Sequence, residues 1–268
     1  MSLLNVESLG IGFDRKIIDD LSFEIYGNNM VAFLCPNGQG KSTFIKALSG
    51  YVPHNEGKIV LDGIRLTKRN LKKYMLKIGA VYENIDEQFL TNAVVSEIRF
   101  PLIHLCYDRD LINERVQFVS EIVKVDKILH KEISSLSMFD KIKVLIATSI
   151  AHFPKLLLLD DVFRFLNKRD KDELFKILNS IREELNISIL FTTSSIDDVI
   201  DLDNILVFAD KNKKLYGDFK EIVIQDNELA KIGLEIPIMI DLSRKLQFYD
   251  LLDDIYYDVD VVVNKLWK

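Results

Sequence analysis

Residues 35–43, with the sequence CPNGQGKST, combine glycines, a lysine and two hydroxyls in the order typical of a phosphate-binding loop. In such a loop the backbone N–H groups point at the anion, and the next helix adds the positive end of its dipole. Gly38 and Gly40 let the backbone approach phosphates without a Cβ in the way. Lys41 can reach the β- and γ-phosphates of a nucleotide, and the Ser42 hydroxyl can bind Mg²⁺. The candidate phosphate-binding residues are Asn37, Gly38, Gln39, Gly40, Lys41, Ser42 and Thr43.

The elements expected on either side of this loop are those that position it. The apolar run at residues 30–34 predicts a buried strand, and residues 44–48 predict the start of a helix. A chance match of the short pattern is the alternative, and the strand–turn–helix context weighs against it. One residue departs from the pattern, which begins with Gly where this chain has Cys35.

A second candidate site follows the sequence KLLLLDD at residues 155–161. Four leucines ending in two acids predict a strand buried on both faces, with carboxylates at its carboxyl end. Ligands bind at that edge of an open parallel sheet, so Asp160 is expected to hold Mg²⁺ through water beside Ser42. A buried structural aspartate is the alternative, although two adjacent buried acids are costly without a partner.

The composition sets the class of protein. A chain of 268 residues with 48% hydrophobic and 28% charged residues is long enough for one large α/β domain and a smaller appendage. A net charge of −6 argues against nucleic-acid binding, and the basic stretch at residues 65–77 is interpreted as a solvated turn and helix face. Two cysteines fit a reducing compartment, and we expect neither a signal peptide nor a membrane-spanning helix. The four histidines lack other ligands at useful spacing, so no metal site made by protein alone is expected.

Other segments complete an α/β pattern. Short strands are predicted within residues 2–34, at 57–63, 77–82 and 187–193, and helical spacing dominates from about 86 to 135. With the phosphate loop and the LLLLDD strand in this order, residues 1–218 resemble an ABC-type ATPase domain. The resemblance implies a P-loop NTPase fold of ABC ATPase type. That fold has a RecA-like core, an antiparallel β-subdomain and a helical subdomain at about residues 86–140.

The resemblance also implies a site and its residues. In this family ATP and Mg²⁺ bind between the phosphate loop of one subunit and the signature of another. Phe13 matches the aromatic residue that stacks on adenine, and Glu83 matches the Q-loop residue beside the nucleotide and its Mg²⁺. Ser137 falls in the signature, which faces the partner's ATP. Asp161 matches the catalytic glutamate, and Ser194 matches the switch-loop histidine.

Several of these positions depart from the family pattern. Glu83 replaces a glutamine, and Met138, Phe139 and Asp140 replace the two glycines and the glutamine of the signature. Asp161 is one methylene shorter than glutamate, and a serine at 194 cannot reach the γ-phosphate as an imidazole does. Since general-base catalysis contributes about 10²–10⁴-fold, Asp161 and Ser194 are weak substitutes. We therefore expect Mg·ATP binding with slow or absent hydrolysis.

Residues 219–268 are similar to the C-terminal extension of ATPases that energise energy-coupling-factor importers, and form a small α-rich candidate dimerisation element. Aromatic residues near the end are expected to pack against the domain or a dimer partner.

This resemblance implies a cytoplasmic subunit at the inner face of the cell membrane, with a transmembrane protein docked near Glu83 to Leu105 and a second ABC ATPase subunit as partner. A heterodimer is favoured, because a homodimer would contain two impaired sites. The alternative is a non-catalytic ATP-binding regulatory or structural module of the same fold.

Overall fold

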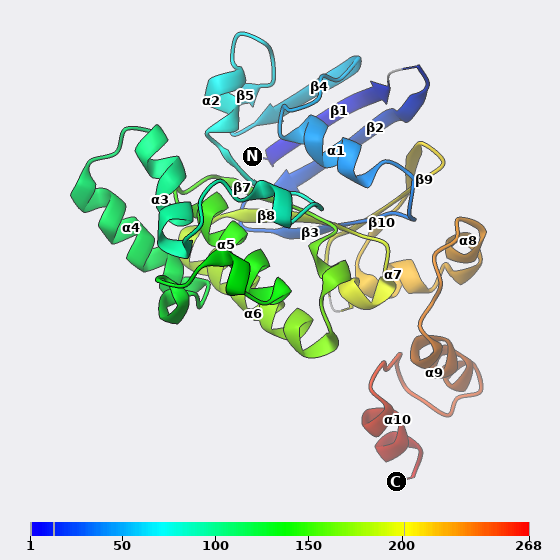
Figure 1. Cartoon of the computed structure of the whole chain (residues 1–268). Coiled ribbons are helices and arrows are strands. Elements are labelled where there is room, and N and C mark those ends of the chain that lie inside the picture. Colours follow the sequence, from blue (N-terminus) through cyan, green and yellow to red (C-terminus); the bar gives the residue numbers. More distant parts are fainter. Residues whose placement is uncertain (1, 13, 201, 268) are drawn as a thin grey trace.

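The computed structural model describes residues 2–12, 14–200 and 202–267, and contains two β-sheets, a helical lobe and a C-terminal group of helices (Figure 1). The central sheet has six strands in the order β10-β9-β3-β8-β7-β6. Its members are β3 (Met30–Leu34), β6 (Ile78–Val81), β7 (Leu156–Asp160), β8 (Ser188–Thr193), β9 (Ile205–Ala209) and β10 (Asn212–Gly217). All pair in parallel except β10, which is antiparallel to β9.

The strands at the centre of this sheet are buried along their whole length, as the near-continuous apolar runs predict. Because β8 lies between β3 and β7, the carboxyl ends of three strands meet at one edge. Their register places Leu34 beside Thr193 and Asp160 beside Thr192. This edge carries both the phosphate loop and the paired acids.

A second, antiparallel sheet has the order β2-β1-β4-β5. It comprises β1 (Ser2–Gly12), β2 (Lys16–Tyr26), β4 (Glu56–Leu61) and β5 (Ile64–Arg65), so the first two strands are longer than the short strands predicted. Helix α1 (Lys41–Leu48) packs against this sheet in a shared apolar core. It buries Phe44 against Phe33 of β3, with ring centroids 4.2 Å apart. The shared core fixes α1, and with it the phosphate loop, between the two sheets.

The helical lobe lies on the other side of the central sheet (Figure 1). It contains η1 (Asp86–Gln88), α3 (Val94–His104), α4 (Arg109–Ile122), η2 (Asp126–Ile128), η3 (Ile133–Ser135) and α5 (Met138–Ile150). The short helix α2 (Leu71–Met75) precedes β6. Helix α6 (Lys168–Leu185) lies in the connection between the adjacent parallel strands β7 and β8. Helices α3 and α5 pack against each other, and one continuous apolar core joins them to the sheet. The expected α/β architecture, a mainly parallel core sheet with an antiparallel sheet and a helical subdomain, is confirmed.

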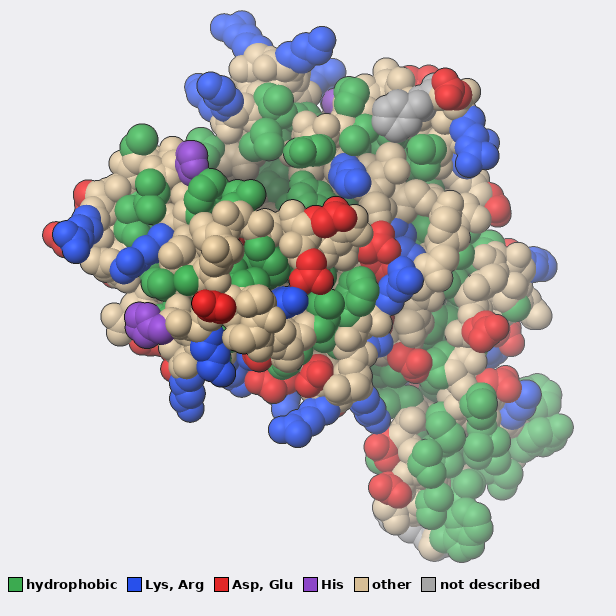
Figure 2. Space-filling model, viewed as in Figure 1, with side chains coloured by type: hydrophobic (Ala, Val, Ile, Leu, Met, Phe, Trp, Pro, Cys, Tyr) green, Lys and Arg blue, Asp and Glu red, His purple; other side chains and the backbone are tan. Residues whose placement is uncertain are grey.

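The C-terminal helices are α7 (Phe219–Val223), α8 (Asp226–Lys231), α9 (Ile238–Phe248) and α10 (Val259–Leu266). A capping box between Asp218 and Glu221 begins α7, and Phe219, Ile222 and Val223 join the main core. By contrast, α9 and α10 extend away from the sheets (Figure 1), and apolar side chains gather on their surface (Figure 2). Over the described ranges, no helix has the length and apolar character needed to cross a membrane.

Candidate functional site

The phosphate loop leaves β3 and enters α1 through two glycines with left-handed backbone. Gly38 has φ +77° and Gly40 has φ +102°, values that L-residues with a side chain rarely adopt. A Cβ on Gly40 would lie 2.5 Å from Cγ2 of Ile17, whereas a Cβ on Gly38 would meet open space. Gly40 is therefore required by both backbone and packing, and the loop at Gly38 is open to a ligand.

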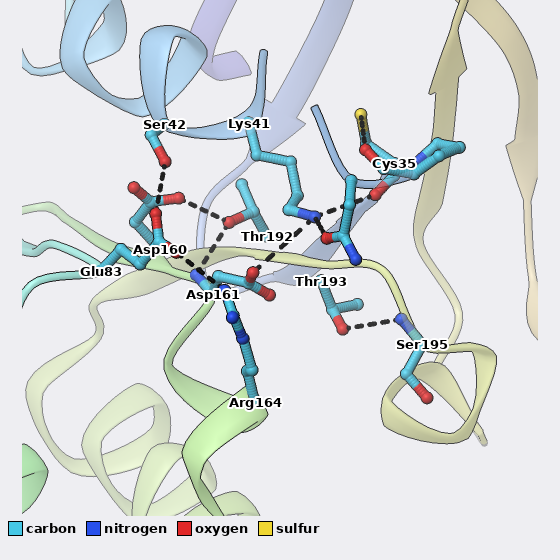
Figure 3. Close-up of polar contacts among 12 residues, drawn as sticks. Cys35, Lys41, Ser42, Glu83, Asp160, Asp161, Arg164, Thr192, Thr193 and Ser195 are labelled. Carbon is cyan, nitrogen blue, oxygen red and sulfur yellow. Dashed lines mark hydrogen bonds and ion pairs between the residues drawn. The ribbon is translucent and has the colours of Figure 1, made fainter. Parts of the chain in front are cut away.

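Lys41 is the first residue of α1, and its buried ammonium group lies inside the loop (Figure 3). Nζ donates to the carbonyl oxygen of Cys35 at 3.2 Å and to Oδ1 of Asn37 at 2.8 Å. It also lies 3.7 Å from Oδ2 of Asp161. These contacts hold the charge where an anion seated on the loop would meet it.

Cys35 replaces the first glycine of the pattern without strain. Its backbone does not have a positive φ, and its side chain is fully buried. Burial raises the pKa of the Cys35 thiol to about 12, so the group stays protonated. The residue acts as a small apolar side chain at the end of β3, where its N–H donates to the carbonyl of Thr193 at 2.9 Å.

The expected metal-binding residues converge from three segments (Figure 3). Ser42 Oγ donates to Oε2 of Glu83 at 3.3 Å, and Oδ1 of Asp160 accepts from the Thr192 hydroxyl at 3.0 Å. The other Asp160 oxygen, Oδ2, is buried and has no hydrogen-bond partner within the described part of the chain. Burial raises the pKa of Asp160, opposed by the Ser42 and Thr192 hydroxyls.

A buried carboxylate oxygen without a donor is costly, and a hard cation or its bound water removes that cost. Hydroxyl and carboxylate oxygens are the ligands that Mg²⁺ prefers. The residues at this corner of the sheet therefore fit the metal expected from the sequence.

Asp161 begins a turn at the end of β7 with left-handed backbone, at φ 52° and ψ 28°. Its N–H donates to the Thr192 hydroxyl at 2.9 Å, so Thr192 links both acids. Burial raises the pKa of Asp161, and the nearby ammonium of Lys41 opposes that shift. The carboxylate thus lies beside the phosphate loop, where its closest cation is Lys41.

The switch loop after β8 is held by a buried acid. Thr193 Oγ1 and Lys171 Nζ each donate to Asp198 at 2.6 Å, and the N–H of Ser195 donates to Thr193 Oγ1 at 3.1 Å. Ser194 is half-buried and lines a groove of about 1000 Å³ that also includes Asn37 of the phosphate loop. Ser194 therefore lies at the rim of the site.

Ser137 lies in the helical lobe, where it caps α5. Its hydroxyl accepts from the N–H of Asp140 at 3.1 Å and donates to Oδ2 of Asp140 at 2.9 Å. Lys143 pairs with the same carboxylate at 2.9 Å. All the hydrogen bonds of the Ser137 hydroxyl described here are within its own helix turn, so the structure does not join it to the phosphate loop of the same chain.

The family model described as "ABC transporter" matches residues 18–164, a span that includes the phosphate loop and both acids after β7. The chain belongs to the ABC transporter family. It is 28% identical to the energy-coupling factor transporter ATP-binding protein EcfA of Malacoplasma penetrans, over 97% of this chain and 89% of that protein. It is 30% identical to EcfA1 of Mesomycoplasma hyopneumoniae strain J, over 95% of this chain and 92% of that protein.

Structural comparison agrees with this placement in the ABC transporter family. CbiO1 from Clostridium perfringens, described as part of the ABC transporter complex cbiONQ, matches with a TM-score of 0.79 and 25% identity. The match covers 93% of this chain and 99% of CbiO1. Because the likeness to CbiO1 and to the two EcfA proteins covers more than nine-tenths of the chain, it continues past residue 218 into the C-terminal helices.

Relative to the sites expected for an ABC protein, the structure brings together Asn37, Lys41, Ser42, Asp160 and Asp161, with Glu83 beside them. Gln39 and Thr43 lie on the same loop and first helical turn. Phe13 lies outside the described residues.

Sequence reasoning missed two residues of this site, Thr192 and Arg164. The position of Thr192 beside Asp160 follows from the register of β7 and β8, which the sequence does not specify. Arg164 Nη1 donates to Glu83 Oε1 at 3.0 Å, but Arg164 lies in a short turn after Asp161, where no periodic pattern predicts its direction.

Proposed function

We propose that this chain is the ATP-binding subunit of an energy-coupling-factor type importer. The subunit binds Mg·ATP, and the closure of the ATPase dimer around the nucleotide is coupled to a transmembrane partner. The observation that carries the proposal is the position of the Lys41 ammonium, held by Asn37 and Cys35 inside a loop that is open at Gly38. The similarity to EcfA proteins along nearly the whole chain supports the type of transporter.

Ground-state binding is proposed to rest on the phosphate loop and the acidic side chains beside it. Backbone N–H groups of the loop and Lys41 would hold the phosphates, while Ser42 and Asp160, with Glu83 beside them, would hold the metal. Bound Mg²⁺ supplies charge neutralisation for the phosphate oxygens. The orphaned Oδ2 of Asp160 supports this assignment, since a cation or its water would complete that atom's contacts.

Hydrolysis is proposed to be slow or absent. The Asp161 side chain is one methylene shorter than glutamate, and its closest cation is Lys41 at 3.7 Å, on the phosphate side of the pocket. Ser194 lies at the rim with a side chain too short to replace an imidazole. Both positions act on the transition state, so their loss lowers the rate more than it lowers nucleotide affinity.

The proposed assembly is a dimer of ATPase subunits in which Ser137 faces the partner's nucleotide. The C-terminal helices support an association role, because Phe248 and Trp267 are 82% and 79% exposed rather than packed on the domain. Exposed apolar patches of this kind mark interaction surfaces. A heterodimer with a catalytically intact subunit fits best, because two copies of this chain would place two weak sites together.

The proposed docking surface for the transmembrane partner lies between Glu83 and Leu105. Leu90 and Ile103 are exposed there. The buried carboxylate of Glu97 accepts from the backbone N–H groups of Leu90 and Thr91, at 3.2 and 2.8 Å. A fixed loop that presents an apolar side chain is suited to hold a helix from another protein.

The test combines nucleotide binding with single-turnover hydrolysis on the purified chain and on its native complex, with Lys41→Ala as control. We expect ATP binding that depends on Lys41, together with phosphate release far slower than that of intact ABC subunits. Turnover at the rate of an intact subunit, abolished by Lys41→Ala, would refute the proposed loss of hydrolysis.

A second experiment separates the transporter from the alternative, an ATP-binding regulatory or structural module. A transporter subunit should co-purify with an integral membrane protein from detergent-solubilised membranes, and Leu90→Asp with Ile103→Asp should release it. Tyr26→Asp, an exposed side chain on β2, is the matched control. Stable ATP binding without any such membrane protein supports the regulatory module instead.

A further inference from the structure

Arg164 and Glu83 form an ion pair at the edge of the metal-binding corner, between segments 81 residues apart in the sequence (Figure 3). Arg164 Nη1 lies 3.0 Å from Oε1 of Glu83. The other oxygen of Glu83, Oε2, accepts from the Ser42 hydroxyl at 3.3 Å. The arginine therefore holds one side of the carboxylate while the other side faces the expected metal site.

This pair changes the charge of a site that must accept a polyanion. Three carboxylates, Glu83, Asp160 and Asp161, lie at this corner, and Asp161 lies 3.7 Å from the ammonium of Lys41. With Arg164 the balance is three negative charges against two positive charges, and without it three against one. Burial raises the pKa of both aspartates and the negative charge of Glu83 adds to that rise, while the positive charges of Lys41 and Arg164 oppose it at Asp161. A glutamine at position 83 would need no counter-charge.

The ion pair contributes little to the stability of the fold. The Arg164 and Glu83 side chains are 61% and 38% exposed, and water screens exposed pairs of this kind. Its effect is instead local, because the phosphate loop and the acids lie within a few ångströms of Glu83. Arg164 and Glu83 thus matter to the charge that a nucleotide meets.

We propose that Arg164 is a positioning residue: it offsets the negative charge of the Glu83 carboxylate and orients that group. A site with a glutamate at position 83, where the family pattern has a glutamine, can then still bind a nucleoside triphosphate. This inference rests on the proposed ATP-binding function. It requires that the effect of Arg164 act through Glu83 and not through direct contact with phosphate. These two explanations predict different results when Glu83 is made neutral. The effect of Arg164 on ATP affinity is then lost if it acts through Glu83, but remains if Arg164 contacts phosphate directly.

The test measures ATP affinity in EDTA, by titration of the purified chain. Arg164→Ala should weaken binding about tenfold, the size expected for one unit charge a few ångströms away near a protein surface. Arg164→Lys keeps the charge and should stay within about threefold of the parent. Glu83→Gln alone should bind ATP at least as tightly as the parent. The double variant Arg164→Ala/Glu83→Gln should bind within about threefold of Glu83→Gln alone, because Arg164 acts through the charge of Glu83. With Mg²⁺ present the deficit of Arg164→Ala should shrink, because the cation offsets the same charge.

The matched control is Arg69→Ala, which removes an exposed arginine between β5 and α2. Among the described residues, Arg69 forms no ion pair. Its affinity should equal that of the parent, and thermal unfolding without nucleotide should be similar for all variants. The inference is overturned if Arg164→Ala binds ATP within about twofold of the parent, or if Arg164→Ala weakens ATP binding as much in the Glu83→Gln background as in the parent. Unchanged ATP binding in Lys41→Ala would instead overturn the proposed function, and the role of Arg164 with it.

Discussion

The phosphate loop and the region around Asp161 and Ser194 lie at the same edge of the central sheet, yet they match the family pattern to different degrees. In the loop, Gly38, Gly40 and Lys41 keep the geometry of an anion site, and Cys35 is accommodated without strain. In the second region, the side chains expected to act on the transition state, Asp161 and Ser194, are shorter than the glutamate and histidine of the family pattern. The contrast supports the proposal that this chain binds nucleotide but hydrolyses it slowly, since binding and hydrolysis depend on different groups.

The largest effect is expected from restoring the second region. Asp161→Glu combined with Ser194→His should raise single-turnover phosphate release in the native complex by about 10²-fold, the lower end of a general-base contribution. Longer side chains at both positions can reach past Lys41 toward the attacking water. An unchanged rate, with ATP affinity intact, would show that the two substitutions do not account for slow hydrolysis. Asp161→Asn/Ser194→His is the control, because it adds the imidazole without a base.

Removing the ammonium from the binding region should have the next largest effect. Lys41→Ala should weaken ATP binding about 10- to 100-fold, because charge-assisted hydrogen bonds to phosphate are lost. Lys41→Arg retains the charge in a different shape and should bind between the two. Equilibrium titration with a fluorescent ATP analogue measures all three. Equal affinity in Lys41→Ala and the parent would contradict the assignment of the loop.

Thr192 links the two regions, because its hydroxyl donates to Asp160 and accepts from the N–H of Asp161. Thr192→Val keeps the shape but leaves both groups unpaired, at a cost of about 1–3 kcal/mol for each group. Thr192→Ser retains the hydroxyl and should lose about 0.8 kcal/mol for the missing methyl group. Urea unfolding of the nucleotide-free chain gives both free energies. Equal stability of the two variants would mean that water or neighbouring groups replace the hydroxyl.

The sequence predicts the binding region better than the region around it, for a physical reason. The loop at 35–43 and the strand before Asp160 are encoded by neighbouring residues, through glycine backbone freedom and continuous apolar runs. The contacts of Thr192 and Arg164 depend on register and on segments far apart in the chain. The exposed aromatic residues of α9 and α10 show the same limit, since composition does not distinguish a domain core from an interface.

The smallest effect is expected at Cys35, which departs from the pattern within the phosphate loop. Its thiol has a pKa of about 12, so almost no thiolate exists at pH 8, and it is fully buried. Iodoacetamide at pH 8 should therefore modify the exposed Cys106 in the folded chain, and Cys35 only after unfolding. Cys35→Ala should leave ATP affinity within about twofold, because the hydrogen bond from Lys41 goes to the backbone carbonyl of Cys35, which the substitution keeps. A large loss of affinity in Cys35→Ala would show that the Cys35 side chain shapes the phosphate loop. The contrast between a phosphate loop that keeps its binding geometry and an altered region around Asp161 and Ser194 would then fail at the first residue of the loop.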